Sequence, residues 1–229
     1  MQGYRPTWAE INLGNLTHNV KAFRQHIPQP TRLMAVVKAD GYGHGDAEVA
    51  RAALAAGADW LAVALVEEGV RLRQAGLAAP ILILGYIPPE SLSAVIQYRL
   101  TPAITDISTL MLMEDEARRQ RRKVGIHLKV DTGMGRLGPR DTGGLDLAKR
   151  TLTSSHLELE GIFTHFATAD DEDKGYTNAQ LDKFKRLVET IKREKPQVIA
   201  HCANSAAAIE IPQAFFDMVR IGISLYGLY

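Results

Sequence analysis

Short apolar runs alternate with amphipathic stretches along the whole chain. The runs have the nearly continuous apolar character of strands that are buried on both faces of a parallel sheet. There are eight of them: Arg32–Lys38, Trp60–Leu65, Ile81–Gly85, Thr101–Thr105, Val124–Val130, Leu157–His165, Val198–Ala203 and Met218–Ile223. Helical periodicity lies between them, in Asp46–Ala56, Val66–Ala75, Ser91–Tyr98, Ile107–Arg121, Thr142–Thr151 and Asn178–Glu194. Eight strands that alternate with helices predict an α/β fold, a (β/α)8 TIM-type barrel, and an open doubly wound sheet is the structural alternative.

The two ends of the chain depart from this alternation. Thr7–Leu13 alternates polar and apolar residues, which predicts a strand, but none of the eight strands is left to pair with it. A helix from Asn15 to about His26 follows. The sequence stops at Tyr229, directly after the last strand and without an eighth outer helix. We therefore expect residues 1–229 to form one barrel domain from which a further part is missing.

The composition narrows the choice of partner and compartment. The 229 residues include 27 basic and 26 acidic side chains, so no bulk charge favours nucleic acid or an anionic membrane. The basic segment Arg118–Lys123 fits the solvated last turn of a helix better than a nucleic-acid patch. The single cysteine, Cys202, excludes an internal disulfide. Since no signal region or membrane-spanning stretch is present, we expect a soluble cytoplasmic protein.

Polar residues gather at the C-terminal ends of the predicted strands, where barrels of this type carry their active sites. They are Lys38 after the first strand, Lys129 and Asp131 at the fifth, His165 at the sixth, His201, Asn204 and Ser205 at the seventh, and Arg220 and Gly222 at the eighth. A single histidine at a strand end is usually a hydrogen-bonded core residue. Five such positions on one rim indicate a functional site, because charged groups rarely gather on an apolar barrel.

Lys38 is the most informative of these residues, since it closes an apolar run directly before the glycine-rich segment Ala39–Gly45. Burying a lysine is costly unless its charge is paired or its amine is neutral. A neutral, desolvated amine is also what covalent attachment to an aldehyde cofactor requires. An isolated lysine at a strand end would more often reach into solvent, so the prediction depends on the rest of the rim.

A glycine-rich stretch after the fifth strand invites a dinucleotide-binding interpretation. Gly133, Gly135 and Gly138 match the pattern G-x-G-x-x-G. However, Pro139 interrupts the position where a helix should open, and the required strand–helix–strand context is lacking. We interpret the stretch as a loop that directs Arg136 into the mouth of the barrel.

The seventh and eighth strand ends predict a phosphate site. Asn204 and Ser205 begin a short alanine-rich helix, where a hydroxyl group and free backbone N–H groups point to one place. Gly222 permits close approach of the neighbouring backbone. Tyr42, four residues after Lys38, could add a phenolic donor.

The segments that carry these residues resemble the motifs of bacterial alanine racemases. They are Val37–Gly45, Lys129–Gly138, Thr164–Ala167, His201–Ser205 and Val219–Gly222. They follow one another in the family's order across the whole chain. Members of this family have fold type III, depend on pyridoxal 5′-phosphate (PLP), and combine an N-terminal barrel with a C-terminal β domain. The resemblance implies an isomerase that interconverts L-alanine and D-alanine for peptidoglycan precursors.

The resemblance also implies which residues hold the cofactor. Lys38 would bind PLP covalently and serve as one of two catalytic bases. The phosphate group would be held by a set of residues from three segments, namely Tyr42, Asn204, Ser205, Gly222 and Ile223. No metal is expected.

Further residues would act on the cofactor ring and on the substrate. By the same resemblance, Arg220 would face the pyridine nitrogen, His165 would lie against the ring, and His201 would support Arg220 from behind. Arg136 would lie near the cofactor O3′ and the substrate carboxylate. Lys129 matches a lysine that is carbamylated in many members and that orients this arginine. A permanently charged donor at Arg220 would keep the ring nitrogen unprotonated and so limit the strength of the electron sink.

One part of the family's machinery has no counterpart in this sequence. The second base of the family is a tyrosine from the C-terminal domain of the partner subunit in a homodimer, and residues 1–13 would pair with that missing domain. We therefore expect this chain to bind PLP but to racemise poorly. Two other interpretations stay open: a non-catalytic single-barrel PLP homeostasis protein, and a metal-dependent hydrolase that uses His165, His201 and a carbamylated Lys129.

Overall fold

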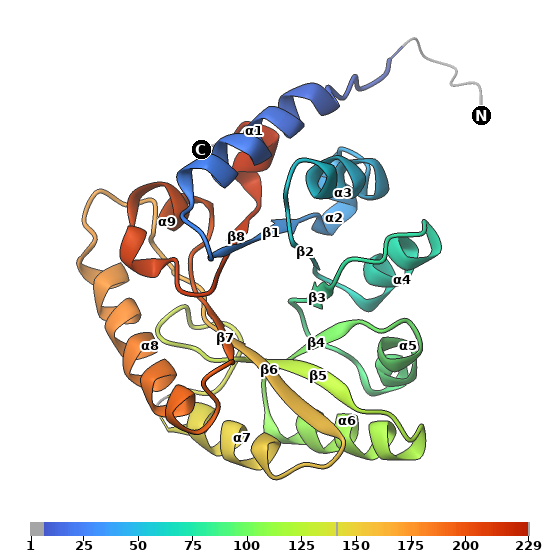
Figure 1. The fold of residues 1–229 in the computed structure, drawn as a ribbon, viewed down its shortest axis with the longest axis vertical. Coiled ribbons are helices and arrows are strands. Elements are labelled where there is room, and N and C mark those ends of the chain that lie inside the picture. Colours follow the sequence, from blue (N-terminus) through green and yellow to red (C-terminus); the bar gives the residue numbers. More distant parts are fainter. Residues whose placement is uncertain (1–6, 141, 229) are drawn as a thin grey trace.

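The computed structural model describes residues 7–140 and 142–228. Its eight parallel strands are β1 (Arg32–Val36), β2 (Trp60–Val63), β3 (Ile81–Ile83), β4 (Thr101–Ile104), β5 (Val124–Lys129), β6 (Leu157–Phe163), β7 (Ile199–His201) and β8 (Met218–Ile221). They pair in the order β7-β6-β5-β4-β3-β2-β1-β8. Two backbone hydrogen bonds join the outermost strands, from Asp217 N to Ala200 O at 3.1 Å and from Arg220 N to Ala203 O at 3.0 Å. The predicted (β/α)8 barrel is therefore confirmed (Figure 1).

Helices surround the barrel. They are α1 (Leu13–His26), α2 (Lys38–Gly43), α3 (Asp46–Ala55), α4 (Val66–Gln74), α5 (Leu92–Gln97), α6 (Ile107–Arg119), α7 (Gly143–Leu152), α8 (Gly175–Glu194) and α9 (Ser205–Glu210), with 3₁₀ turns η1 (Pro89–Ser91), η2 (Pro212–Ala214) and η3 (Ile223–Tyr226). The six helices predicted between strands are confirmed within a few residues, whereas α2 was not predicted. No helix in the described part of the chain is both long enough and apolar enough to cross a membrane.

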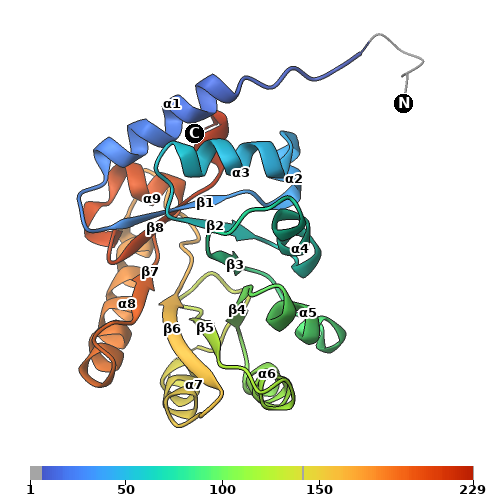
Figure 2. The same cartoon turned by 45° about the vertical axis from the view of Figure 1, so that its right-hand side comes forward.

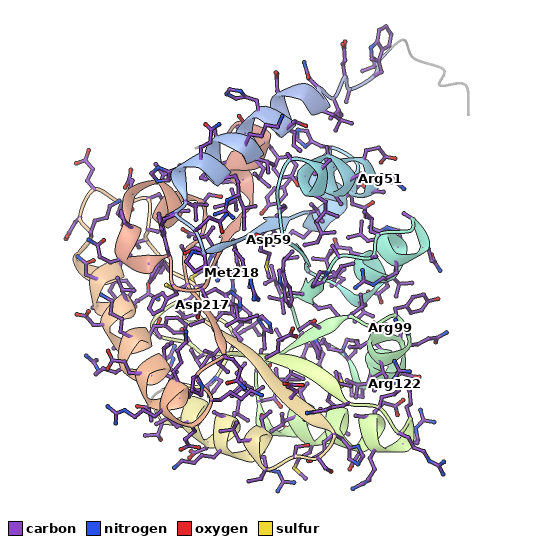
Figure 3. The ribbon with its side chains drawn as sticks, viewed as in Figure 1. Arg51, Asp59, Arg99, Arg122, Asp217 and Met218 are labelled. Atoms are coloured by element: carbon purple, nitrogen blue, oxygen red, sulfur yellow. The ribbon has the colours of Figure 1, made fainter. Side chains whose placement is uncertain are left out.

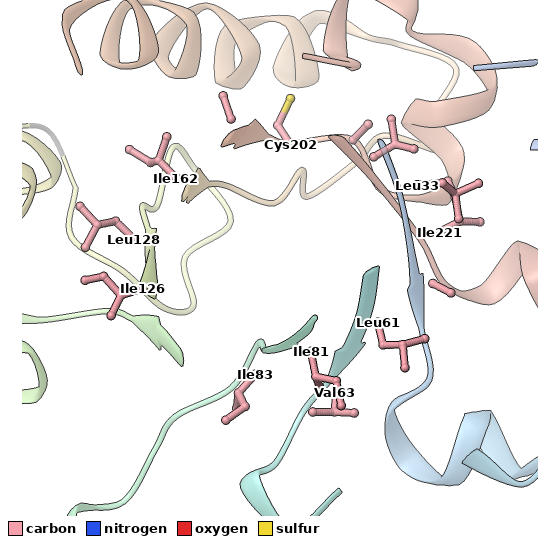
Figure 4. Packing of buried hydrophobic residues seen from close by; sticks show 14 of the residues in the cluster. Leu33, Leu61, Val63, Ile81, Ile83, Ile126, Leu128, Ile162, Cys202 and Ile221 are labelled. Carbon is pink, nitrogen blue, oxygen red and sulfur yellow. The ribbon is translucent and has the colours of Figure 1, made fainter. Parts of the chain in front are cut away.

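Strand alternation decides which side chains enter the barrel. Leu33, Ala35 and Val37 belong to the apolar layer between the strands and the helices, whereas Met34 and Val36 belong to a separate cluster inside the barrel. Figure 4 shows part of the outer layer, including Ile126 and Leu128 of β5. Because side chains alternate along a strand, the neighbours of these β5 residues, His127 and Lys129, face inward.

The segment before α1 is not the strand expected over Thr7–Leu13. Residues 7–12 have no regular secondary structure and are exposed, and residues 1–6 lie outside the described residues. A β-strand forms only when its backbone N–H and C=O groups pair with a neighbouring strand. An extended segment without such a neighbour therefore does not become a strand. No strand of the described ranges pairs with it. Pairing of residues 1–13 with another domain stays a prediction.

Helix α1 lies beside the C-terminal end of the described chain, as Figures 1 and 2 show. Leu16, Val20 and Phe23 bury its inner face. The amide of Asn19 donates to Leu225 O of η3 at 3.1 Å. The helix therefore covers the outer side of the barrel beside η3, which follows β8.

Two carboxylates join neighbouring strands at the N-terminal end of the barrel (Figure 3). Asp59, before β2, accepts a hydrogen bond from Leu33 N at 2.7 Å. Asp217, before β8, accepts from Ala200 N at 2.8 Å and from Lys192 Nζ at 2.6 Å. These contacts hold adjacent strands in register at the end opposite the strand C-termini, where the polar residues gather.

Candidate active site

A cavity of about 750 Å³ opens at the C-terminal ends of the strands. Its volume lies within the range of ordinary cofactor pockets, about 300–1,000 Å³. Ten of the residues singled out from the sequence line it: Lys38, Tyr42, Lys129, Arg136, His165, Asn204, Ser205, Arg220, Gly222 and Ile223. His201 does not line the cavity, because it is fully buried on the far side of Arg220.

Lys38 enters the cavity at the start of a left-handed turn. Residues 39–42 all have φ between 52° and 60° and ψ between 36° and 53°. This conformation costs about 1–2 kcal/mol for each residue that carries a Cβ atom. The turn leaves Lys38 half-buried and brings its Nζ to 5.8 Å from the centroid of the Tyr42 ring. Two predicted cofactor residues therefore reach one cavity from a single strand end.

Glu68, at the start of α4, stabilises this turn. One oxygen of its carboxylate accepts a hydrogen bond from Ala39 N at 2.6 Å, and the other accepts from Ala64 N at 2.7 Å and from Leu65 N at 3.0 Å. The side chain is buried. Hydrogen bonds from backbone N–H groups to a buried carboxylate are among the stronger ones in proteins. Glu68 thus connects the ends of β1 and β2 below Lys38.

Arg220, from β8, lies at the bottom of the cavity and is nearly fully buried. Its Nη1 donates to His201 O at 3.1 Å and contacts His201 Nδ1 at 2.9 Å. Its Nη2 donates to Thr164 O at 2.8 Å and to Cys202 O at 3.2 Å. Burial lowers the pKa of Arg220 to about 10, which still leaves it charged at neutral pH. The hydrogen bonds of the described residues with Arg220 use Nη1 and Nη2, and its Nε is left for another partner.

The histidines beside Arg220 are neutral. His165 Nδ1 lies 3.3 Å from Arg220 Nη2, and burial together with the charge of Arg220 lowers the pKa of His165 to about 3. The same two causes hold the pKa of His201 well below its ordinary value. Since a guanidinium only donates, the Nδ1 atom of each ring must be the acceptor. Both rings therefore act as acceptors toward Arg220.

Lys129, from β5, is buried beside the Phe163 ring. Its Nζ lies 5.7 Å from the ring centroid, and Arg220 Cζ lies 5.3 Å from the same centroid. Burial, and then the positive charges of Arg136 and Arg220, lower the pKa of Lys129 to about 8. A substantial fraction of this amine is therefore neutral near physiological pH, unlike an ordinary lysine.

The loop that carries Arg136 is held by Asp131. The Asp131 carboxylate accepts from Gly133 N at 3.0 Å, from Gly135 N at 3.0 Å and from Arg140 Nε at 3.2 Å. Burial raises the pKa of Asp131, but these hydrogen bonds outweigh burial and lower it overall. Arg136 itself is exposed at the open side of the cavity. The loop therefore places a cation at the cavity mouth, as expected.

A further part of the cavity presents hydroxyl groups and backbone. Ser205 Oγ accepts hydrogen bonds from Gly222 N at 3.0 Å and from Ser224 N at 3.5 Å, so its own hydroxyl proton is free to be donated. A Cβ atom at Gly222 would lie 2.8 Å from Tyr42 Oη, so a larger residue there would require the Tyr42 side chain to shift. Asn204 Oδ1 accepts from Ala207 N at 3.0 Å and caps α9. This combination suits an anionic group.

Sequence reasoning missed two buried residues of this region. His127 occupies an inward position of β5 two residues before Lys129, and strand alternation would have placed it inside the barrel. Its Nδ1 lies 2.8 Å from His201 Nε2. Glu68 follows the second strand at the third position of a predicted helix, where a carboxylate often caps backbone N–H groups.

The metal-centre interpretation does not match these contacts. His165 and His201 both turn Nδ1 toward the Arg220 guanidinium, so a cation already occupies the position that a shared metal would need. Within residues 7–140 and 142–228, no group of three or more His, Cys, Asp and Glu residues could hold a metal ion.

Comparison with known proteins gives one consistent result. The model of the family described as "Alanine racemase, N-terminal domain" matches residues 11–229. Alanine racemase 1 of Oceanobacillus iheyensis is 46% identical over 228 residues, which are 99% of this chain and 61% of that protein. Alanine racemase of Symbiobacterium thermophilum is 47% identical over 233 residues, or 100% of this chain and 60% of that protein.

Solved structures agree with the sequence relatives. Alanine racemase from Clostridium difficile 630 has a TM-score of 0.95 and 37% identity, over 100% of this chain and 60% of that one. Alanine racemase from Bacillus anthracis with bound L-Ala-P has a TM-score of 0.88 and 35% identity, over the same shares. The chain thus spans about 60% of the length of the relatives it matches.

Proposed function

This chain belongs to the alanine racemase family through the family's N-terminal domain, and we propose that it forms the PLP-binding part of an enzyme that interconverts L-alanine and D-alanine. The observation that carries the proposal is one cavity that contains a half-buried lysine, a buried arginine and a hydroxyl-lined end. The three groups have the chemistry that an aldehyde, a pyridine nitrogen and a phosphate require. PLP offers all three in one molecule.

The residues present fit PLP in detail. Lys38 supplies the amine for a covalent bond to the aldehyde. Beside the ring nitrogen, Arg220 supplies a guanidinium group that can donate a hydrogen bond but cannot accept one. Ser205 has a hydroxyl proton free for a phosphate oxygen, and Gly222 leaves the space that such a group needs. Tyr42 and Ile223 line the cavity with them. PLP supplies an electron sink for the electron pair left when a proton leaves the Cα atom of the amino acid.

The protein's own residues then divide the remaining tasks. Arg136, at the cavity mouth, would bind the substrate carboxylate. Lys38 would remove or return the Cα proton on one face, and His165 would pack against the ring. Arg220 would keep the ring nitrogen unprotonated, which limits electron withdrawal and disfavours protonation at the wrong carbon. These roles assign a step of binding or proton transfer to three cations that line the cavity, Lys38, Arg136 and Arg220.

Lys129 has a different role in this proposal. Its buried amine, with a pKa of about 8, is partly neutral near physiological pH. The neutral amine can add carbon dioxide and release one proton to solvent, which gives a carbamate. The carbamate would exchange a positive charge for a negative one beside Arg136 and would orient that guanidinium. The proposed modification would also remove repulsion between the two cations.

Racemisation needs a second base on the opposite face of the substrate. We assign no residue of this chain to that task, and we propose that a C-terminal domain of a partner subunit supplies it in a homodimer. The complete protein would act in the cytoplasm and supply D-alanine for peptidoglycan. Residues 1–229 alone would bind PLP and turn over slowly.

An absorption spectrum tests the cofactor assignment. Residues 1–229 are loaded with PLP and measured before and after borohydride, which fixes a cofactor joined to an amine. We expect a visible band that disappears on reduction and a mass increase on the peptide that contains Lys38. The Lys38→Ala variant is the control and should show neither. An unmodified Lys38 in the presence of excess PLP would disprove the assignment.

Deuterium exchange tests the single-base assignment. A chain with one base should exchange the Cα proton of one alanine enantiomer with deuterium of the solvent faster than it converts that enantiomer into the other. The experiment compares exchange by NMR with interconversion by chiral chromatography. Interconversion as fast as exchange would show that residues 1–229 already contain both bases, and the proposed division between domains would be wrong.

A further inference from the structure

Three buried side chains form a continuous hydrogen-bonded series under the cavity. Arg220 Nη1 lies 2.9 Å from His201 Nδ1, and His201 Nε2 lies 2.8 Å from His127 Nδ1. The two histidines are fully buried, and Arg220 is nearly so. Of the three residues, only Arg220 lines the cavity. The series therefore extends from the cavity into the interior of the barrel.

Only one arrangement of protons satisfies this series. Arg220 can only donate, so His201 Nδ1 must accept and the proton of His201 must lie on Nε2. His201 Nε2–H then donates to His127 Nδ1, which places the proton of His127 on Nε2. Burial, followed by the charge of Arg220, lowers the pKa of His127 to about 3, so both rings are neutral. Each proton position agrees with both ends of the series, the donor at Arg220 and the acceptor at His127 Nδ1.

The barrel is shaped to hold the His127 ring in this position. The pairing of β5 with β6 shifts register between Ile126 and His127, which brings Gly161 opposite His127. A Cβ atom at Gly161 would lie 2.5 Å from the His127 ring. Trp60 packs against the same ring with a centroid distance of 5.3 Å. Any residue larger than glycine at position 161 would displace the ring.

This arrangement has an energetic cost. His127 Nε2 is buried and has no hydrogen-bond partner among the described residues. A buried polar group without a partner destabilises the folded state, because it has lost its hydrogen bonds to water. An apolar side chain of similar size would fill the same space without this cost. Packing alone therefore does not explain a histidine at position 127. The hydrogen bond that its Nδ1 accepts from His201 Nε2 does.

We propose that His127 is a positioning residue that fixes the tautomer of His201 and thereby the direction of the Arg220 guanidinium at the cavity floor. Without an acceptor at position 127, a proton on His201 Nε2 would be buried without a partner, and only the contact with Arg220 would still favour that tautomer. A proton on Nδ1 would face the Arg220 donors and push the guanidinium away. The proposal about the two histidines stands on geometry alone, and its consequence for PLP rests on the proposed function.

The test uses two substitutions of nearly equal size. Asparagine at position 127 keeps an oxygen acceptor close to the place of the histidine Nδ1, whereas leucine has the same shape and no acceptor. Tautomers are read from the ring ¹⁵N shifts of His201, in the chain of residues 1–229 without cofactor. We expect the Nε2–H tautomer in the wild-type chain and in His127→Asn, and its loss in His127→Leu. PLP should bind about tenfold more weakly to His127→Leu, a difference of about 1.4 kcal/mol, and within twofold of wild type to His127→Asn.

Each outcome decides the proposal. A wild-type His201 with its proton on Nδ1 overturns it, and so does a His127→Leu variant that keeps the wild-type tautomer and PLP affinity. Should His127→Leu fail to fold, as judged by circular dichroism, the wild-type and His127→Asn spectra still decide. A chain that bound no PLP would disprove the proposed function but would leave the tautomer result intact.

Discussion

Acid should destabilise this barrel more strongly than it destabilises a barrel without buried histidines. His127 and His201 are fully buried and neutral, because burial and the Arg220 charge lower the pKa of each. In the unfolded chain both return to an ordinary pKa of about 6.5. The unfolded chain therefore binds more protons than the folded one below that pH. Stability is full above about pH 6.5 and is lost as the pH falls toward 3, the folded-state pKa of His127.

The size of the loss follows from the proton difference. Between pH 7 and pH 5, each histidine that stays neutral in the folded state lowers the free energy of unfolding by about 2 kcal/mol. The pair together accounts for about 4 kcal/mol, a large part of the 5–15 kcal/mol that stabilises an ordinary domain. In His127→Asn one of the two titrating groups is absent. The loss between pH 7 and pH 5 should then be smaller by about 2 kcal/mol.

Urea unfolding at the two pH values measures this difference. Subtracting the loss of each variant between pH 7 and pH 5 from the loss of the wild-type chain cancels the contribution of the carboxylates, which both chains share. His18→Asn, at an exposed position of α1, is the control for the substitution itself and should lose as much stability as the wild-type chain. An equal loss in wild type and His127→Asn would refute the reasoning, because it would mean that folding does not suppress protonation of His127.

Three further substitutions probe the supports of the site. Gly161→Ala places a Cβ atom 2.5 Å from the His127 ring. It should lower the free energy of unfolding, measured with urea, by at least about 2 kcal/mol. An unchanged free energy of unfolding would show that the ring can move. Gly138→Ala, at φ 104° and 2.5 Å from a carbonyl oxygen of β5, should destabilise at least as much in the same assay. Asp131→Ala removes the acceptor of two backbone N–H groups and should speed tryptic cleavage within residues 133–140, whereas unchanged cleavage would show that the loop is held elsewhere.

The barrel and most of its rim could be predicted from simple periodicities. Continuous apolar runs separated by helical stretches indicated eight strands, and Lys129 and Arg220 fell at the ends of the fifth and eighth of them. The C-terminal end of each strand is where barrels of this type expose polar groups. The pattern therefore located Lys38 and His165 on the same rim, and the structure brings both to one cavity.

What the sequence could not indicate depends on contacts between distant segments. The segment Ala39–Gly45 is glycine-rich, which predicts a turn but not the left-handed one that residues 39–42 form. That conformation is held by Glu68, which is 29 residues away from Ala39. The segment Thr7–Leu13 alternates like a strand, but alternation alone cannot create a neighbour to pair with. Local pattern therefore predicted elements well and their partners less well.

The left-handed turn after Lys38 also limits how this lysine motif could be moved to another protein. Copying residues 37–45 would transfer the amine but not the carboxylate that accepts from Ala39 N, which comes from the following βα unit. Without it, a chain of L-residues would relax to a right-handed or extended conformation and turn the amine elsewhere. A transplant that is meant to present a reactive amine would therefore need at least the first two strand–helix units, through Glu68.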